Sequence, residues 1–366
     1  MGFSCGIVGL PNVGKSTLFN ALTATAQAAA ENYPFCTIEP NLARVPVPDP
    51  RLDKLAALAR SARVVPTQID FVDIAGLVRG ASRGEGLGNK FLANIREVDA
   101  IAHVLRCFED GGVTHVEGTV DPLRDAEIVE TELLIADLES LERRLDPLVK
   151  RARGGDREAR ALAPLMERVV AALRAGRPAR SVAVAADEGR AFRSLHLLTA
   201  KPVMYVCNVD EDAAATGNAL SAAVAKRAAA EDAGAIVISA QIEAEIAAMD
   251  AAEARDAFLA ALDLEVPGLH RVIHAGYRLL GLITFLTCGP KESRAWTVPE
   301  GATAVEAAGT IHGDFARGFI RVEVIAYDDY IALGGEQAVK DAGKMRVEGR
   351  DYRIRDGDIL HFRFNV

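Results

Sequence analysis

Residues 9–16 of the chain read Gly-Leu-Pro-Asn-Val-Gly-Lys-Ser. This stretch fits the pattern G-x-x-x-x-G-K-[ST], the P-loop, whose glycine-rich turn points main-chain N–H groups at phosphate oxygens. A short apolar run precedes it at residues 5–8, and a helix-like run follows at residues 17–22. A strand, a turn and a helix in this order predict an α/β nucleotide-binding domain, with the phosphates at a helix N-terminus.

Side chains of this stretch are expected to share the work of holding a triphosphate. Lys15 is the candidate catalytic lysine, because its ammonium group can reach the β- and γ-phosphates. The Ser16 hydroxyl is expected to ligate Mg²⁺. The other members of the predicted phosphate-binding set are Asn12, Val13, Gly14 and Thr17.

A second phosphate-facing segment is predicted about sixty residues further on. Residues 73–76 read Asp-Ile-Ala-Gly and end another apolar run. We expect Asp73 to hold Mg²⁺ through a water molecule and the Gly76 N–H to meet the γ-phosphate. Thr37 lies between the two motifs, where a threonine can ligate Mg²⁺ and order a loop around the γ-phosphate.

The predicted base site follows the apolar run at residues 202–207. Residues 208–211 read Asn-Val-Asp-Glu, where guanine-specific enzymes carry N-K-x-D. Val209 replaces the lysine and Glu211 replaces the aspartate that accepts two hydrogen bonds from guanine. The sequence thus predicts loss of guanine preference more firmly than gain of adenine preference. Asn208, Ser239 and Ala240 are also expected near the base.

The pattern of apolar residues changes along the chain and divides it into parts. Leucines at 134, 138, 141, 145 and 148 alternate in spacing between four and three, which predicts one arm of a helical, coiled-coil-like hairpin. Pro147 lies inside this arm and is expected to kink or interrupt it. We predict a nucleotide domain over residues 1–280, interrupted by the hairpin at 124–200, and an α+β domain over 281–366.

The predicted hairpin tip is basic. Residues 143–160 contain seven Arg or Lys against three acids, namely Arg143, Arg144, Lys150, Arg151, Arg153, Arg157 and Arg160 against Asp146, Asp156 and Glu158. A solvated tip explains this charge, and so does contact with an acidic partner such as RNA.

Composition narrows the class of protein further. The chain has 366 residues and a net charge of −9, which argues against bulk electrostatic binding of nucleic acid, and no DNA partner is indicated. Its five cysteines are far apart and form no CxxC pair, which favours a reducing compartment. No apolar run is long enough for a bilayer, so we expect no membrane partner and a cytoplasmic location.

Together these motifs resemble the YchF, or Obg-like ATPase, family of P-loop GTPase-fold proteins. The specific marks are residues 32–41, 73–82, 84–88, 208–211 and 356–366. The resemblance implies an Obg-type G domain, an inserted coiled-coil hairpin and a C-terminal β-grasp (TGS) domain. It also implies Mg²⁺-dependent hydrolysis of ATP in preference to GTP, association with the ribosome through rRNA or ribosomal protein, and roles in translation and stress response.

The source of catalytic power stays open at this point. Ras-like enzymes place a glutamine after D-x-x-G to orient the attacking water, but here Leu77 stands there. His115 matches the loop histidine that the resemblance implies for this work, although a lone loop histidine is usually just exposed. Asn12 matches relatives that bind K⁺ in place of an arginine finger, and a turn-forming asparagine is an equal explanation.

Two other functions fit the same motifs. One is a GTP-specific, ribosome-associated GTPase. The other is an interaction module that binds nucleotide with negligible turnover, which the missing glutamine makes a serious alternative.

Overall fold

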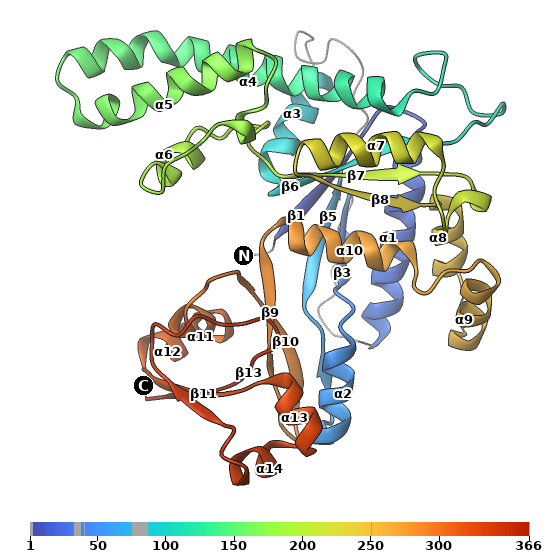
Figure 1. Ribbon diagram of the computed structural model, residues 1–366, viewed down its shortest axis with the longest axis vertical. Helices are drawn as coiled ribbons and strands as arrows, with labels where there is room; N and C mark the ends of the chain where they lie inside the picture. The colour runs from blue at the N-terminus through green and yellow to red at the C-terminus, as the bar shows by residue number, and fades with distance from the viewer. Residues whose placement is uncertain (1–2, 33–37, 40, 75–86, 250, 366) are drawn as a thin grey trace.

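The computed structural model describes residues 3–32, 38–39, 41–74, 87–249 and 251–365. Figure 1 shows three parts: a large sheet with helices on both faces, a projecting pair of helices, and a second sheet. Among the described residues the first sheet has seven strands and the second has six. Within these residue ranges, no helix is both long and apolar enough to cross a bilayer.

The seven-stranded sheet carries the nucleotide motifs. Its order is β2-β3-β5-β1-β6-β7-β8. Strands β5, β1, β6, β7 and β8 are parallel, whereas β3 runs antiparallel to β5 and β2 antiparallel to β3. The strands are β1 (Ser4–Val8), β2 (Ile38–Glu39), β3 (Leu42–Pro46), β5 (Gln68–Asp73), β6 (Ala100–Arg106), β7 (Val203–Asn208) and β8 (Gly234–Ile238).

Both faces of this sheet are covered, which explains its almost uninterrupted apolar strands. Successive side chains of a strand point to opposite faces. Met204 and Val206 join the core beneath α10, whereas Tyr205 and Cys207 join the core beneath α7. The two helices therefore lie on opposite faces (Figure 1). The helices of this part are α1 (Lys15–Asn32), α3 (Leu87–Glu97), η2 (Glu211–Ala213), α7 (Ala219–Ala230), α8 (Ala240–Ala247), α9 (Ala252–Ala261) and α10 (Gly268–Leu279).

The projecting pair is α4 (Pro122–Arg153) and α5 (Arg157–Arg174), followed by η1 (Ala179–Ser181) and α6 (Gly189–Arg193). Asp121 caps α4 by accepting a hydrogen bond from Arg124 N, and Asp156 caps α5 in the same way from Ala159 N. The first half of α4 packs on the sheet core through Ile128, Val129 and Leu133. The predicted leucine seam packs against α5 in a separate core, with Leu141 and Leu148 buried and the other three leucines partly buried.

Pro147 was expected to kink or interrupt this arm, and the interruption does not occur. It lies inside α4, which runs unbroken from Pro122 to Arg153. Proline removes one helical hydrogen bond at that position. Leu141 and Leu148, on either side of it, are buried against α5, and this packing outweighs the loss.

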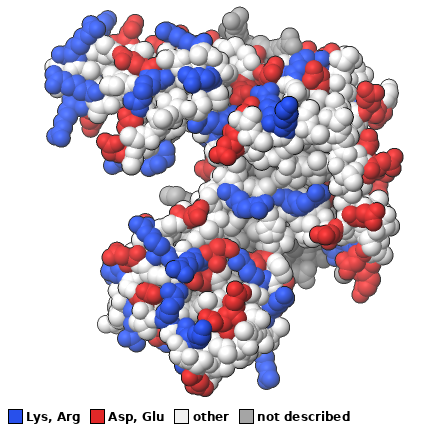
Figure 2. All heavy atoms as spheres, viewed as in Figure 1, with Lys and Arg blue, Asp and Glu red and all other residues white. Residues whose placement is uncertain are grey.

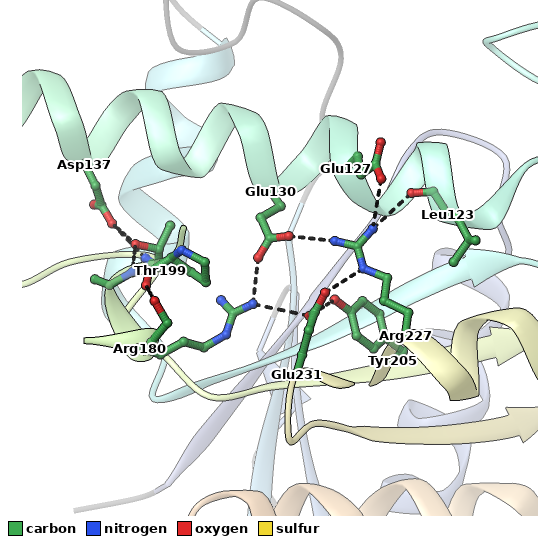
Figure 3. Close-up of polar contacts among 12 residues, drawn as sticks. Leu123, Glu127, Glu130, Asp137, Arg180, Thr199, Tyr205, Arg227 and Glu231 are labelled. Carbon is green, nitrogen blue, oxygen red and sulfur yellow. Dashed lines mark hydrogen bonds and ion pairs between the residues drawn. The ribbon is translucent and has the colours of Figure 1, made fainter. Parts of the chain in front are cut away.

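Four charged side chains fasten the base of the pair to the sheet (Figure 3). Glu130 of α4 accepts hydrogen bonds from Arg180 Nη2 at 2.6 Å and from Arg227 Nη2 at 2.7 Å. Glu231 accepts from Arg227 Nε at 2.8 Å and from Tyr205 Oη at 2.8 Å. The network joins α4 to η1, α7 and β7, and so attaches the helical hairpin to the sheet.

The second sheet has the order β12-β11-β13-β9-β10-β4. It consists of β4 (Val64–Val65), β9 (Leu282–Thr287), β10 (Ser293–Pro299), β11 (Phe319–Ile325), β12 (Arg346–Glu348) and β13 (Ile359–Phe364). The accompanying helices are α11 (Ala304–Ile311), α12 (Gly313–Arg317), α13 (Tyr327–Leu333) and α14 (Glu336–Asp341). With these helices it forms an α+β unit.

One segment from the first part of the chain belongs physically to this unit. β4 pairs in parallel with β10, so that Val64 faces Ser293. The preceding helix, α2 (Pro50–Ala59), buries Leu52 and Leu55 in a core shared with the C-terminal strands (Figure 1). Residues 50–65 therefore link the two sheets covalently, between β3 and β5, while they pack in the core of the second sheet.

Candidate functional site

The P-loop turn lies between β1 and α1, as the motif predicts. Asn12 and Gly14 adopt left-handed backbone conformations, with φ of 62° and 96°. A Cβ atom on Gly14 would stand 2.2 Å from the Asn208 Nδ2 atom. Glycine is required at this position by both its backbone angle and the close approach of a neighbouring side chain.

The first turn of α1 offers main-chain N–H groups that have no acceptor within the helix. Lys15 begins this turn and is 7% exposed. Its Nζ donates to the Leu10 carbonyl oxygen at 2.7 Å. Burial lowers the pKa of Lys15 to about 8, and the charge of Asp73 opposes that shift. Ser16 is exposed, so its hydroxyl is accessible beside the lysine.

Asp73 ends β5 next to the P-loop strand, with Ile7 of β1 as its partner in register. Its Oδ1 atom is buried and has no hydrogen-bond partner in the part of the chain that the structure describes. Burial raises the pKa of Asp73, and the Lys15 charge opposes this. A buried carboxylate oxygen without a donor is costly. A hydrated cation would satisfy it, so Asp73 and Ser16 fit the predicted Mg²⁺ site.

The predicted base residues meet in one cavity of about 710 Å³. Its size is typical of small-molecule sites. Of the residues predicted from sequence, those lining it are Asn12, Gly14, Thr17, Asn208, Val209, Glu211, Ser239 and Ala240. The phosphate turn and the base segment thus border the same space.

The Asn208 side chain connects two segments of this site. Its Nδ2 donates to the Val13 carbonyl oxygen at 3.0 Å, and its Oδ1 accepts from Ala240 N at 2.9 Å. The buried amide therefore ties the P-loop to the first residue of α8. Ser239 caps α8 through its side chain. Val209 is 2% exposed and packs in the core beneath α7. Unlike the lysine of guanine-specific enzymes, this short, uncharged side chain cannot extend along the base.

His115 lies beside the P-loop, but its ring faces α4. The neighbouring Thr114 carbonyl accepts a hydrogen bond from Asn12 Nδ2 at 3.2 Å. His115 Nδ1 accepts from Glu117 N at 3.1 Å, so Nε2 carries the proton and donates to Asp125 Oδ2 at 2.8 Å. The ring is 7% exposed with both nitrogens engaged. Acting on a water molecule would require it to leave Asp125.

The chain is similar to known proteins along its whole length. A family model described as "50S ribosome-binding GTPase" matches residues 4–136. The YchF GTPase C-terminal model, described as "Protein of unknown function (DUF933)", matches residues 282–365. The "Ribosome-binding ATPase YchF" of Haemophilus influenzae is 56% identical over 366 residues, all of both chains. That of Bacillus subtilis is 50% identical over 368 residues, again all of both.

The chain belongs to the YchF family. A solved structure, "Structure of the Schizosaccharomyces pombe YchF GTPase", superposes with a TM-score of 0.89 at 37% identity. The match covers 99% of this chain and 98% of that one. The predicted fold class, a P-loop α/β domain with a helical insertion and a C-terminal α+β unit, is confirmed, and so is the resemblance from which much of it came.

Two predicted site residues of this YchF-family chain, Thr37 and Gly76, lie outside the described residues, as does Leu77. Their roles stay predictions. Within the described ranges, no group of three or more His, Cys, Asp or Glu side chains forms a metal centre.

Residues 106–113 were missed by sequence reasoning. Phe108, Asp110 and Val113 line the cavity, and Arg106 lies behind them. The signal that could have shown this was an arginine at the end of an otherwise apolar strand. Such a residue must find polar partners on burial, and the following loop is the nearest source.

Proposed function

We propose that the chain is a Mg²⁺-dependent hydrolase of nucleoside triphosphates that prefers ATP to GTP and acts as a nucleotide-dependent switch on the ribosome. One observation carries the proposal. The P-loop turn, with its buried lysine, and the base segment border a single cavity. The printed name of the bacterial relatives, "Ribosome-binding ATPase YchF", supports the activity and the partner.

The phosphate chemistry rests on groups of this chain. Lys15 would exchange the Leu10 carbonyl for β- and γ-phosphate oxygens, and the first-turn N–H groups of α1 would hold the same phosphates. Ser16 and, through water, Asp73 would hold Mg²⁺, with Thr37 as a further ligand. The ion, when bound, offsets negative charge that develops on the phosphates. No covalent nucleophile is needed, because positioning and charge dominate this reaction.

Water activation is assigned to His115 and added charge to K⁺ at Asn12. The Leu77 side chain cannot hydrogen-bond to water. His115 would release Asp125 to act on water, and its neighbour Thr114 already contacts the P-loop residue Asn12. The Asn12 side-chain oxygen would contact K⁺ near the transferred phosphoryl group.

The proposed base selection rests on weakened recognition of guanine at residues 208–211. Glu211 is longer than the aspartate that reads guanine, and Val209 lacks the lysine stem that flanks the base. The Phe108 ring offers an apolar wall for a purine. These features weaken guanine recognition without adding an adenine-specific contact, so the ATP preference in this proposal also draws on the name of the bacterial relatives.

The partner surface is assigned to the hairpin tip. Figure 2 shows Lys and Arg side chains gathered over α4 and α5. Lys150, Arg151 and Arg153 of the last turn of α4 are exposed. In a chain of net charge −9, such a local concentration suits contact with ribosomal RNA in the cytoplasm. In this proposal, residues 1–280, interrupted at 124–200, form the Obg-type G domain, and 281–366 form the β-grasp (TGS) domain.

Calorimetric titration with ATP and with GTP, each with Mg²⁺, tests base selection. We expect tighter binding of ATP. Clear preference for GTP would overturn the base-site argument and favour a GTP-specific enzyme. The Schizosaccharomyces pombe relative and the family that matches residues 4–136 are both called GTPases.

Turnover separates an enzyme from a nucleotide-binding interaction module. Phosphate release should depend on Mg²⁺, increase with K⁺, and disappear in Lys15→Ala. Activity that survives Lys15→Ala comes from a contaminant. Tight binding with no turnover in any salt, or on addition of ribosomes, would favour the module.

A further inference from the structure

Arg106, the last residue of β6, is 1% exposed. Burying a guanidinium group is costly unless other acceptors replace the lost water. Here Nε donates to the Phe108 carbonyl at 3.1 Å, Nη1 to the Val113 carbonyl at 2.9 Å and Nη2 to the Asp110 carbonyl at 3.2 Å. All three acceptors belong to the main chain of one loop, residues 108–113, which therefore curls around the charge.

The outer side of this loop is a wall of the base cavity. Phe108, Asp110 and Val113 all line that space. The Arg106 guanidinium carbon lies 4.7 Å from the centroid of the Phe108 ring, and Phe108 lines the cavity whereas Arg106 does not. Two further bonds close the turn, from Val113 N to Asp110 O and from Gly112 N to Asp110 Oδ1. The wall is thus formed before any ligand arrives.

Asn208, at the end of the neighbouring strand β7, arranges another part of the cavity wall. Arg106 pairs in register with Asn208 of β7. The Asn208 amide joins the P-loop to α8, as described above. Two adjacent strand ends therefore each arrange one side of the cavity, the arginine through the loop at 108–113 and the asparagine through the P-loop and α8.

We infer that Arg106 is a positioning residue for base recognition, which holds residues 108–113 as a preformed wall for the purine. The inference rests on the proposed function, because it concerns the same nucleotide site. A preformed wall lowers the ordering cost that a ligand must overcome. Without the guanidinium, the loop loses its common anchor, while the P-loop and Lys15 keep their own contacts. Removing the guanidinium should therefore weaken binding of the nucleoside part of the ligand, not binding of its phosphates.

The test compares a nucleotide with a ligand that has phosphates but no base. Calorimetric titrations of Mg·ATP and of Mg·tripolyphosphate are made on wild type, Arg106→Lys and Arg106→Met. The matched control is Arg227→Met, another arginine in a buried network, which anchors the hairpin. We expect Arg106→Met to lose about tenfold to hundredfold in ATP affinity, as supporting residues of a site commonly do. Its affinity for tripolyphosphate should change little.

Arg106→Lys should lie between wild type and Arg106→Met, because an ammonium group keeps the charge but reaches fewer of the three carbonyls. Arg227→Met should keep the wild-type ratio of the two affinities. If Arg106→Met does not fold, the ratio in Arg106→Lys decides the matter.

An unchanged ratio in folded Arg106 variants overturns the inference, and so does a parallel loss of both ligands. Equal affinity of wild type for ATP and tripolyphosphate overturns it too, while leaving the phosphate site intact. If wild type binds neither ligand, the proposed function itself is wrong.

Discussion

At the scale of single residues, the site depends on the ammonium group of Lys15, which is buried where a positive charge loses its hydration. Lys15 is almost fully buried, and burial lowers its pKa from 10.5 to about 8. Only the protonated lysine attracts a triphosphate, so the bound state keeps the proton to higher pH than the free state. Near pH 8, binding must therefore take up protons.

We predict that ATP affinity is flat below pH 7.5 and falls above about pH 8, by up to about tenfold per pH unit. Titrations in buffers of different ionisation enthalpy should show uptake of about half a proton at pH 8. Lys15→Arg is the control, because its guanidinium does not titrate in this range. The same pH dependence in wild type and Lys15→Arg would assign it to another group.

His115 presents a choice between a catalytic and a structural role. It donates to Asp125 Oδ2 at 2.8 Å, which fixes its loop to the first turn of α4. If the ring must leave Asp125 to orient water, His115→Ala should lower kcat by roughly hundredfold with KM little changed. Asp125→Asn loosens the bond without removing the ring and should not lower kcat. Equal, small effects of both variants on kcat, with loss of thermal stability, would leave His115 a structural residue.

At the scale of elements, α4 belongs to two cores. Its first half packs on the nucleotide sheet and its second half on α5. The network of Glu130, Arg180, Arg227 and Glu231 lies where the helix leaves the sheet (Figure 3). These side chains are about one fifth exposed, so their ion pairs are less screened than surface pairs.

We predict that Glu130→Gln costs about 2 kcal/mol of local stability, because two charge-assisted hydrogen bonds are weakened. Hydrogen exchange of the α4 amides over residues 122–136 measures it. Glu142→Gln is the matched control: Glu142 pairs with Arg174 at 2.8 Å, but both side chains are largely exposed, so the loss should be below about 1 kcal/mol. A loss of local stability that is no larger for Glu130→Gln than for Glu142→Gln would show that the network does not attach the hairpin to the sheet.

Local sequence patterns predicted some elements well and failed on others for physical reasons. The P-loop is a contiguous motif whose geometry follows from its own residues, and the leucine seam follows from helical spacing. The interruption expected at Pro147 is absent because packing against α5, which a local pattern does not contain, helps to hold the helix together. Arg106 was missed because a buried charge is satisfied by carbonyls that only the folded loop brings together.

At the scale of the whole molecule, the two sheets are linked through residues 50–65. The two-residue strand β4 pairs with β10, more than two hundred residues later. A strand so short carries no sequence signal, and its partner is far away in the chain, so no local pattern predicts the pairing. Arg51 adds a polar link, because it donates to Asp356 Oδ2 at 2.7 Å. The C-terminal unit is thus incomplete without an N-terminal segment.

We predict that Leu55→Ala destabilises the C-terminal sheet by about 2–5 kcal/mol, since Leu55 is fully buried in the shared core. Leu58 lies on the same helix but is 42% exposed, so Leu58→Ala should have little effect. Hydrogen exchange of β9, β11 and β13 makes the comparison. Faster exchange confined to the nucleotide sheet, or equal effects of both substitutions, would contradict this assignment of α2.

The central claim, that the turn at residues 9–14 grips a triphosphate, is tested most directly by titrating Mg·ATP into wild type and Gly14→Ala. A Cβ atom at residue 14 would collide with Asn208 and sit at a φ of 96°, whereas one at Gly289, the matched control, meets nothing within 4 Å. We predict saturable binding by wild type and Gly289→Ala, and at least about tenfold weaker binding by Gly14→Ala. Failure of the wild-type chain to bind, or undiminished binding by Gly14→Ala, would contradict the account.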